Sequence, residues 1–194
     1  MDEIAEEHPL KPFFPKGARM LMLGSFPPSR KRWSMEFYYP NFQNDMWRIF
    51  GIVFFGDRDK FVIKGKKAFD RKAIIRFLKE KRIALGDTVA EAVRLKGTAS
   101  DADLKVKASI NIKEVLDKLP KCNLIVSTGG KSAEILSKAL AINLPLTGQP
   151  VKIAITDKRD ITLYRMPSSS RAYPMSIEKK AAMYAKMFAD NGIL

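Results

Sequence analysis

Residues 37–47 hold the densest group of side chains that could bind a ligand or act on it. Phe37, Tyr38 and Tyr39 follow one another directly, and the amide of Asn44 stands just ahead of a predicted helix. An aromatic ring can stack on an unpaired base, a contact of about 1–3 kcal/mol per base. An amide that caps a helix at the mouth of a pocket can also hold a water molecule. The segment therefore indicates a base-binding pocket.

A purely structural interpretation of this segment stays open. Tyr38 and Tyr39 could form a hydrophobic staple that fixes the entry of the chain into the helix. Asn44 and Asp45 both have the residue type of a helix N-cap. Asp45 is better explained by its favourable position near the helix macrodipole than as a catalytic base.

Three segments rich in small and hydroxyl-bearing residues each follow a predicted strand: residues 24–29, 128–131 and 167–171. If the strands are parallel, their carboxyl ends place the three loops at one edge of the sheet, where α/β proteins bind ligands. Small residues allow backbone N–H groups to approach a phosphate or a base edge closely. On a basic chain, such an edge indicates a nucleic-acid cleft.

The run Gly130-Lys131-Ser132 resembles the end of a P-loop, but the required glycine is replaced by Ile125. A nucleotide-binding P-loop is therefore excluded. Lys131 at the start of a helix could still hold a DNA phosphate, and an ordinary strand-to-helix turn explains the same residues.

Hydrophobic periodicity predicts strands and helices in alternation. The predicted strands cover residues 18–23, 123–128, 151–156 and 161–165. The predicted helices cover residues 44–53, 69–78, 87–94, 131–141 and 176–189, with one more between the capping box at Asn111 and Pro120. This order predicts a three-layer α/β/α sandwich with a mostly parallel central sheet, formed as a single domain by residues 1–194.

Composition narrows the possible functions. The 194 residues include 35 Lys plus Arg against 21 Asp plus Glu, a net charge of +14, spread over the whole chain. This favours a polyanionic partner, nucleic acid first, because Lys and Arg neutralise phosphates. The single cysteine excludes a disulfide framework, a thiolate zinc site and a Cys-ligated iron–sulfur cluster. The single histidine, His8, stands in a polar N-terminal stretch, which argues against a Ser-His-Asp triad or a His-rich metal site.

The N-terminal residues are acidic and no apolar stretch follows them, unlike in a signal peptide. No apolar run approaches the ~18 residues that suggest a membrane span. We therefore expect a cytoplasmic monomer without membrane contact, cofactor or metal ion.

Four blocks occur in a definite order: residues 23–27, residues 37–47, residues 130–133, and residues 166–170 followed by 176–179. In this order and spacing they resemble motifs of the uracil-DNA glycosylase superfamily, specifically its mismatch-specific and hypoxanthine-DNA glycosylase branches. The resemblance covers most of the chain. It implies hydrolysis of the N-glycosidic bond of a deaminated base, uracil or hypoxanthine, in DNA during base-excision repair. The implied partner is DNA that contains a damaged or mispaired base.

The resemblance also implies roles for individual residues. Asn44 matches the catalytic asparagine of the hypoxanthine branch, and Tyr39 matches the aromatic residue that stacks on the flipped base. Ser127 or Thr128, at the end of a strand, could read the edge of that base, and Asn111 is a weaker candidate. The implied base-binding residues are Gly24, Ser25, Phe26, Pro27, Tyr39 and Thr128. The implied DNA-binding residues are Lys131, Ser168, Ser169, Ser170, Arg171 and Ala172.

The sequence departs from the family pattern at three places. Phe26 stands where the mismatch-specific branch has its water-positioning asparagine. Residues 41–42 are Asn-Phe where the family has His-Pro, and residues 171–173 are Arg-Ala-Tyr where it has Pro-Ala-Asn. These positions concern base recognition and the wedge, so the base that is excised stays open.

The implied reaction does not require a pair of catalytic carboxylates. A departing uracil or hypoxanthine delocalises its negative charge, so hydrogen-bond donors can replace the strong general acid that O-glycosidases need. Asn44 would orient the attacking water, and backbone N–H groups of residues 24–26 would bind the base oxygen. Two alternatives stay open: a non-catalytic nucleic-acid-binding protein of the same fold, and a hydrolase of free nucleosides or nucleotides.

Overall fold

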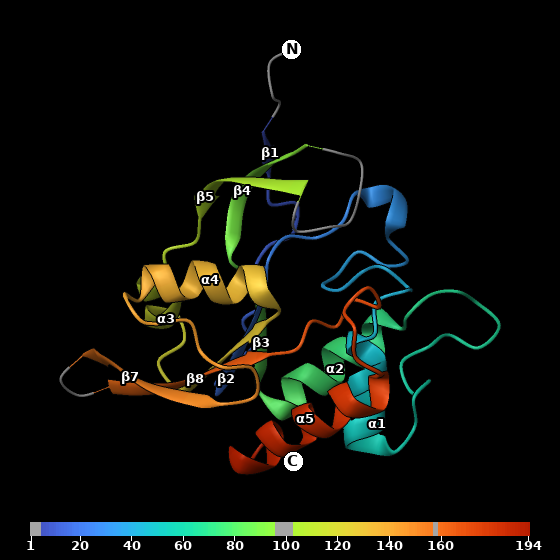
Figure 1. Cartoon of the computed structure of the whole chain (residues 1–194). Helices are drawn as coiled ribbons and strands as arrows, with labels where there is room; N and C mark the ends of the chain where they lie inside the picture. Colours follow the sequence, from blue (N-terminus) through green and yellow to red (C-terminus); the bar gives the residue numbers. More distant parts are fainter. Residues whose placement is uncertain (1–4, 96–102, 157–158) are drawn as a thin grey trace.

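A five-stranded sheet in the order β3-β2-β6-β8-β7 forms the centre of the computed structural model, which describes residues 5–95, 103–156 and 159–194 (Figure 1). The first four of these strands run parallel, and β7 is antiparallel to β8. The mostly parallel sheet predicted from the sequence is therefore confirmed. Its strands are β2 (Met20–Gly24), β3 (Ile83–Asp87), β6 (Leu124–Thr128), β7 (Pro150–Thr156) and β8 (Arg159–Met166).

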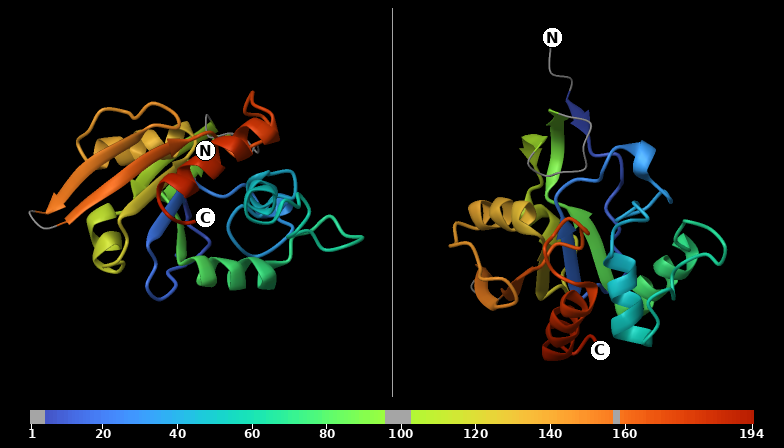
Figure 2. Two further views of the ribbon diagram at one scale, coloured as in Figure 1. Left: turned by 90° about the horizontal axis from the view of Figure 1, so that it is seen from below. Right: turned by 45° about the vertical axis from the view of Figure 1, so that its right-hand side comes forward.

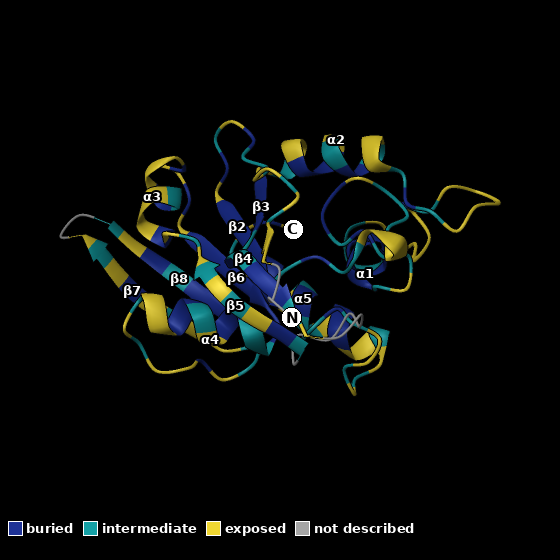
Figure 3. Cartoon of the chain, turned by 90° about the horizontal axis from the view of Figure 1, so that it is seen from above, coloured by how far each residue is buried: buried dark blue, intermediate teal, exposed yellow. Residues whose placement is uncertain are grey.

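Helices cover both faces of this sheet (Figure 2). On one face lie α1 (Met46–Phe55), α2 (Arg71–Lys81) and α5 (Ile177–Asp190), and on the other α3 (Ile112–Asp117) and α4 (Gly130–Ala139). Side chains alternate between the faces of a strand, so Met20 and Met22 enter the first core while Leu21 and Leu23 enter the second. The central strands are buried, whereas the outer side of α2 is exposed (Figure 3).

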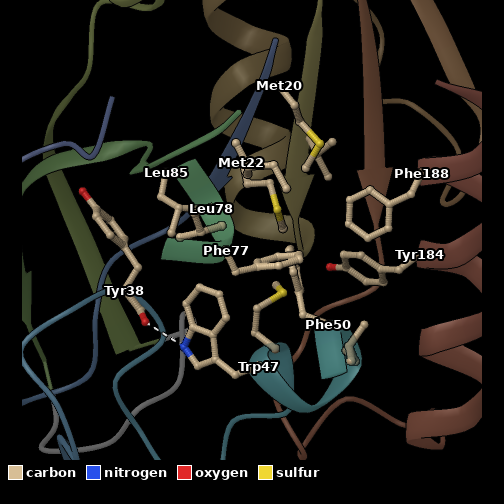
Figure 4. Packing of buried hydrophobic residues seen from close by; sticks show 14 of the residues in the cluster. Met20, Met22, Tyr38, Trp47, Phe50, Phe77, Leu78, Leu85, Tyr184 and Phe188 are labelled. Atoms are coloured by element: carbon tan, nitrogen blue, oxygen red, sulfur yellow. Dashed lines mark hydrogen bonds between the residues drawn. The ribbon is translucent and has the colours of Figure 1, made fainter. Parts of the chain in front are cut away.

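The core between the sheet and α1, α2 and α5 is rich in aromatic side chains (Figure 4). Trp47 is almost completely buried there, and its indole N–H donates a hydrogen bond of 3.1 Å to the backbone carbonyl of Tyr38. This bond joins the aromatic segment ahead of α1 to the core. The other aromatic residues of Figure 4 are Phe50, Phe77, Tyr184 and Phe188.

A second, smaller sheet has the order β1-β4-β5 and is antiparallel throughout. Its strands are β1 (Glu6–Glu7), β4 (Val89–Arg94) and β5 (Leu104–Ser109). The helix predicted over residues 87–94 is therefore wrong. Ala, Glu and Arg in this segment favour helix, but pairing with a strand on each side outweighs that weak local preference. β1, β3 and β5 were not predicted from the sequence.

The other predicted elements are confirmed within a few residues. The four predicted strands correspond to β2, β6, β7 and β8, and the remaining helices to α1, α2, α4, α5 and α3. Asn111 caps α3, because its side-chain oxygen accepts the N–H groups of Lys113 and Glu114. Residues 157–158, in the turn predicted between β7 and β8, lie outside the described residues. Within the described parts of the chain, no helix is long and apolar enough to cross a membrane.

Candidate active site

The three loops expected at one edge of the sheet do lie together there. They follow β2, β6 and β8, which are parallel and hydrogen-bonded in that order. A cavity of about 620 Å³ opens where they meet. It is lined by Gly24, Ser25, Phe26, Pro28, Arg32, Tyr39, Pro40, Asn41, Gln43, Asn44, Asp87, Thr128, Ser168, Ser169, Ser170, Arg171, Ala172, Tyr173 and Pro174.

All of the predicted site residues except Pro27 and Lys131 line this cavity. Pro27 is buried, and its backbone carbonyl accepts a hydrogen bond of 2.7 Å from the guanidinium of Arg94. Lys131 lies in the first turn of α4, outside the cavity wall. Ser127 is also outside, because its buried hydroxyl donates to the carbonyl of Tyr164. Asn111, at the start of α3, is not part of the wall either.

Asn44 is held in place at the start of α1. Its side-chain oxygen accepts a hydrogen bond of 2.9 Å from the backbone N–H of Met46, the first residue of the helix, while the N-cap position itself is occupied by Asp45. The guanidinium of Arg48 donates to the backbone carbonyls of Asn44 (3.2 Å) and Phe42 (2.7 Å). Arg48 is itself buried, over the rings of Phe42 and Phe69. Beyond the bond to Met46, the amide keeps two N–H donors and one oxygen lone pair with which to hold a water molecule.

Tyr39 and Tyr38 have separate roles although they are adjacent. Tyr38 is buried in the core, whereas Tyr39 lines the cavity and has a backbone φ of +50°. That left-handed conformation costs a residue with a side chain about 1–2 kcal/mol, and such strain concentrates at ligand sites. The hydroxyl of Tyr39 lies 2.9 Å from that of Thr128, which donates to the carbonyl of Leu23. Tyr39 is therefore the donor in this pair. Burial raises the pKa of Tyr39 well above its usual value, and the charge of Asp87 adds to this, so the phenol stays neutral.

A buried ionic link ties the serine-rich loop, residues 168–172, to the start of α1. The backbone N–H of Asp45 donates to the carbonyl of Ser169 (2.9 Å), and its carboxylate lies 3.1 Å from Nε of Arg171. The other carboxylate oxygen lies 3.7 Å from Nζ of Lys180, which also donates to the carbonyl of Ser170 (2.7 Å). Asp45 and Lys180 are both buried. Asp45 therefore fixes the loop beside Asn44, a role beyond the helix-dipole interaction inferred from its position.

Within the serine-rich loop, side chains bond to nearby backbone groups. The hydroxyl of Ser168 accepts from the N–H of Ser170, and the hydroxyl of Ser170 accepts from the N–H of Ala172. The loop is thus shaped by its own serines. Arg171 is about half exposed despite its ion pair, and Arg32 is an exposed cation on the same cavity.

Asp87 is a cavity residue that the sequence analysis missed. It ends β3, and its carboxylate oxygen Oδ2 lies 2.8 Å from Nε2 of His8. Both side chains are largely buried, with 8% of Asp87 and 13% of His8 exposed. Burial alone would lower the pKa of His8, but the hydrogen bond to Asp87 and its negative charge raise it above the usual value. The sequence does contain a sign of this residue. The run of residues 83–86 is apolar and ends at Asp87, just as the apolar run of residues 20–23 ends at Gly24.

Among the described residues, no group of three or more His, Cys, Asp or Glu side chains is arranged to hold a metal ion. The groups that line the cavity are hydroxyls, amides, one carboxylate, aromatic rings and two arginines. Such a set can bind a planar, hydrogen-bonding ring inside the cavity and an anion at its mouth.

Comparisons with known proteins show a likeness of fold. No protein-family model matches the sequence, and no curated protein matches it. The structure resembles the solution NMR structure of a protein from Methanosarcina acetivorans named "putative Uracil DNA glycosylase", with a TM-score of 0.58 and 21% sequence identity. The likeness covers 95% of this chain and 99% of that one. The two proteins therefore share a fold over nearly their whole length.

Proposed function

We propose that this chain is a DNA glycosylase that hydrolyses the N-glycosidic bond of a deaminated base in DNA. The observation that carries the proposal is that Asn44, Tyr39 and the turn at Gly24 line one cavity at the carboxyl edge of the sheet. The serine-rich loop, more than 120 residues further along the chain, completes the same wall. The fold shared with the Methanosarcina acetivorans protein and the net charge of +14 agree with a DNA substrate.

The base enters the cavity in a flipped conformation, at a cost of a few kcal/mol that is lowest for a mispaired or damaged base. Of the aromatic rings that line the cavity, those of Phe26, Tyr39 and Tyr173, we assign stacking on the base to Tyr39. The turn of residues 24–26 is held rigid because the carbonyls of Gly24 and Ser25 accept the N–H groups of Thr88 and Val89. A rigid turn can present backbone N–H donors to a base oxygen without rearrangement during the reaction.

Asn44 positions the water that replaces the base at the sugar. The departing base carries a delocalised negative charge, so no strong general acid is required. The carboxylate of Asp87 can accept a hydrogen bond from a ring N–H, a donor that lactam bases such as uracil and hypoxanthine carry. Arg32, Arg171 and the serine-rich loop would hold the phosphates on either side.

Release of free base from duplexes that contain uracil or deoxyinosine tests the proposal. Asn44→Ala should lower the single-turnover rate at least about 100-fold, as expected for one removed transition-state contact, while DNA binding survives. Because alanine also removes the hydrogen bond that Asn44 accepts from the N–H of Met46, Asn44→Ser is the matched variant: a serine hydroxyl can accept the same local bond but lacks the amide. Both variants should lose excision, and only the alanine variant should also lose stability.

Two outcomes would overturn the proposal. Unchanged excision in both Asn44 variants would remove Asn44 from the mechanism. Salt-dependent binding without abasic product across a panel of lesions would assign the chain as a non-catalytic nucleic-acid-binding protein. That alternative is favoured by Phe26, which stands where the mismatch-specific glycosylases carry an asparagine. Activity on free nucleosides without DNA would instead assign a nucleoside hydrolase.

A further inference from the structure

His8 lies behind the cavity wall, in contact with Asp87. The chain brings it there because β1 pairs with β4 and the backbone N–H of His8 donates to the carbonyl of Ala90 (2.9 Å). The imidazole is enclosed by Phe26, edge-on at 5.2 Å between ring centroids, and by Tyr38, stacked at 6.2 Å. His8 does not line the cavity itself, but two of the side chains that it contacts, Asp87 and Phe26, do. Of these two, only Asp87 is charged.

The hydrogen bonds of His8 indicate two ring protons. Nε2 lies 2.8 Å from a carboxylate oxygen of Asp87, so one proton lies between them. Nδ1 has two neighbours on Leu10: the backbone carbonyl at 2.8 Å and the backbone N–H at 3.2 Å. The shorter contact is to an acceptor and needs a proton on Nδ1, so we assign the second ring proton there, at the expense of the longer contact. An imidazole with both protons is a cation. The pair is therefore an imidazolium against a carboxylate, with no net charge.

The two oxygens of Asp87 have different surroundings. Oδ2 accepts from His8, whereas Oδ1 faces the turn at Gly24, so closely that a Cβ atom on Gly24 would lie 2.5 Å from it. The same Cβ would lie 3.6 Å from the hydroxyl oxygen of Tyr39. Asp87 thus joins a cation outside the cavity to the wall that would contact the base.

Other ionisable groups surround the pair. Arg94 of β4 pairs with Glu6 at 3.1 Å, and its guanidinium also lies over the ring of Phe26. The hydroxyls of Tyr38 and Tyr39 stay neutral because burial and the charge of Asp87 raise the pKa of both. The remaining charged groups near His8 are Glu7 and Lys11 of the N-terminal segment and Glu91 of β4.

We propose that His8 is a positioning residue for base excision: its protonated imidazole holds the Asp87 carboxylate at the cavity wall and neutralises it. This inference rests on the proposed function. A bare carboxylate beside the departing base would repel the negative charge that develops on it, and a neutral pair does not. No proton is transferred in this role, so excision should require His8 to be protonated and should fall as pH rises through the His8 pKa.

The first test needs no enzymatic activity. His8 is the only histidine of the chain, so its ring signals in an NMR titration are unambiguous. We expect a pKa above 6.5, and a decrease of about one unit or more in Asp87→Asn, where the opposite charge is gone. A pKa at or below 6.5 in the wild type, or the same pKa in both proteins, would overturn the pairing.

The second test is the pH dependence of single-turnover excision. Above the His8 pKa, the wild-type rate should fall about tenfold per pH unit. His8→Gln, which keeps a donor but no charge, should lower the rate about tenfold or more at pH 6 and should abolish that fall. In the Asp87→Asn background, adding His8→Gln should change the rate little. The control is Glu6→Gln, which removes a charge and an exposed ion pair from the same segment and should leave the profile unchanged.

A wild-type pH profile in His8→Gln would overturn the role of His8 in the reaction. If the wild-type chain releases no base from any lesion, the proposed function fails and the role of His8 in excision fails with it. The NMR titration still decides whether the charged pair exists, so the two failures are distinguishable.

Discussion

Gly24 and Asp87 approach each other so closely that the wall of the cavity has no room for a methyl group between them. A Cβ atom on Gly24 would lie 2.5 Å from Oδ1 of Asp87. Gly24 is not in the left-handed region, so glycine is required here for space rather than for backbone conformation. The ends of β2 and β3 therefore meet directly, and the Asp87 carboxylate lies against the turn of residues 24–26.

Gly24→Ala should displace Asp87 and lower excision at least about tenfold. Overpacking of this kind costs typically about 1–3 kcal/mol of stability, so the protein should still fold. Single-turnover excision and chemical denaturation measure the two effects. Gly130→Ala is the matched control, because a Cβ there would meet only Arg165, at an ordinary 3.7 Å. Equal activity of Gly24→Ala and the wild type would show that the wall tolerates movement of Asp87.

Asp45→Ala should destabilise the protein by about 3–5 kcal/mol, because it leaves the buried ammonium of Lys180 without its carboxylate partner. It should also free the serine-rich loop from α1, which faster amide hydrogen exchange in residues 168–172 would report. Asp190→Asn breaks an exposed pair with Lys186 and should leave stability unchanged. A small effect of Asp45→Ala, similar to that of Asp190→Asn, would contradict the structural role of the buried link.

Stability should depend on pH through His8. The pKa of His8 is raised in the folded protein, so protonated His8 adds to the free energy of unfolding. This stabilisation is fully present below the unfolded-state pKa of about 6.5 and is lost as the pH rises through the folded-state pKa. The difference in unfolding free energy between the wild type and His8→Gln should therefore be larger at pH 6 than at pH 9. Urea denaturation at the two pH values measures it. A difference that grows with pH would mean that folding favours the neutral imidazole.

Arg32→Ala should weaken binding to DNA of any sequence and make its salt dependence less steep by about 0.9 in the slope of log K against log salt. Arg32 lines the cavity and is exposed, which suits contact with a phosphate. Lys79→Ala, near the end of α2 that leads into the start of β3, lies at the opposite edge of the sheet and serves as the control. Lys131→Ala tests whether the DNA also reaches the start of α4. Equal slopes for Arg32→Ala and Lys79→Ala would exclude a phosphate contact at Arg32.

The sequence predicted much of the candidate site because most of its residues follow strands with clear local patterns. β2 ends in glycine, β6 ends in threonine, and a serine-rich loop follows β8; parallel strands bring such ends together. Tyr39 and Asn44 were found by a similar local signal, aromatic residues and an amide ahead of an amphipathic helix. Pro27 and Lys131 were expected in the site for the same reason, but their neighbours in space place them outside the cavity wall.

What the sequence by itself determined is the set of strands and helices with strong periodicity, their alternation, and the loops at the carboxyl ends of the strands. These features depend on residues close together in the chain, where side-chain spacing decides which face is buried. Only the tertiary structure decided that residues 89–94 form a strand, that Asp87 reaches the cavity, and that Asp45 anchors Arg171. The His8–Asp87 contact joins residues 79 apart and the Asp45–Arg171 contact joins residues 126 apart. A charged side chain carries no local sign of its partner, because its pairing depends on which distant element the packing of the core places beside it.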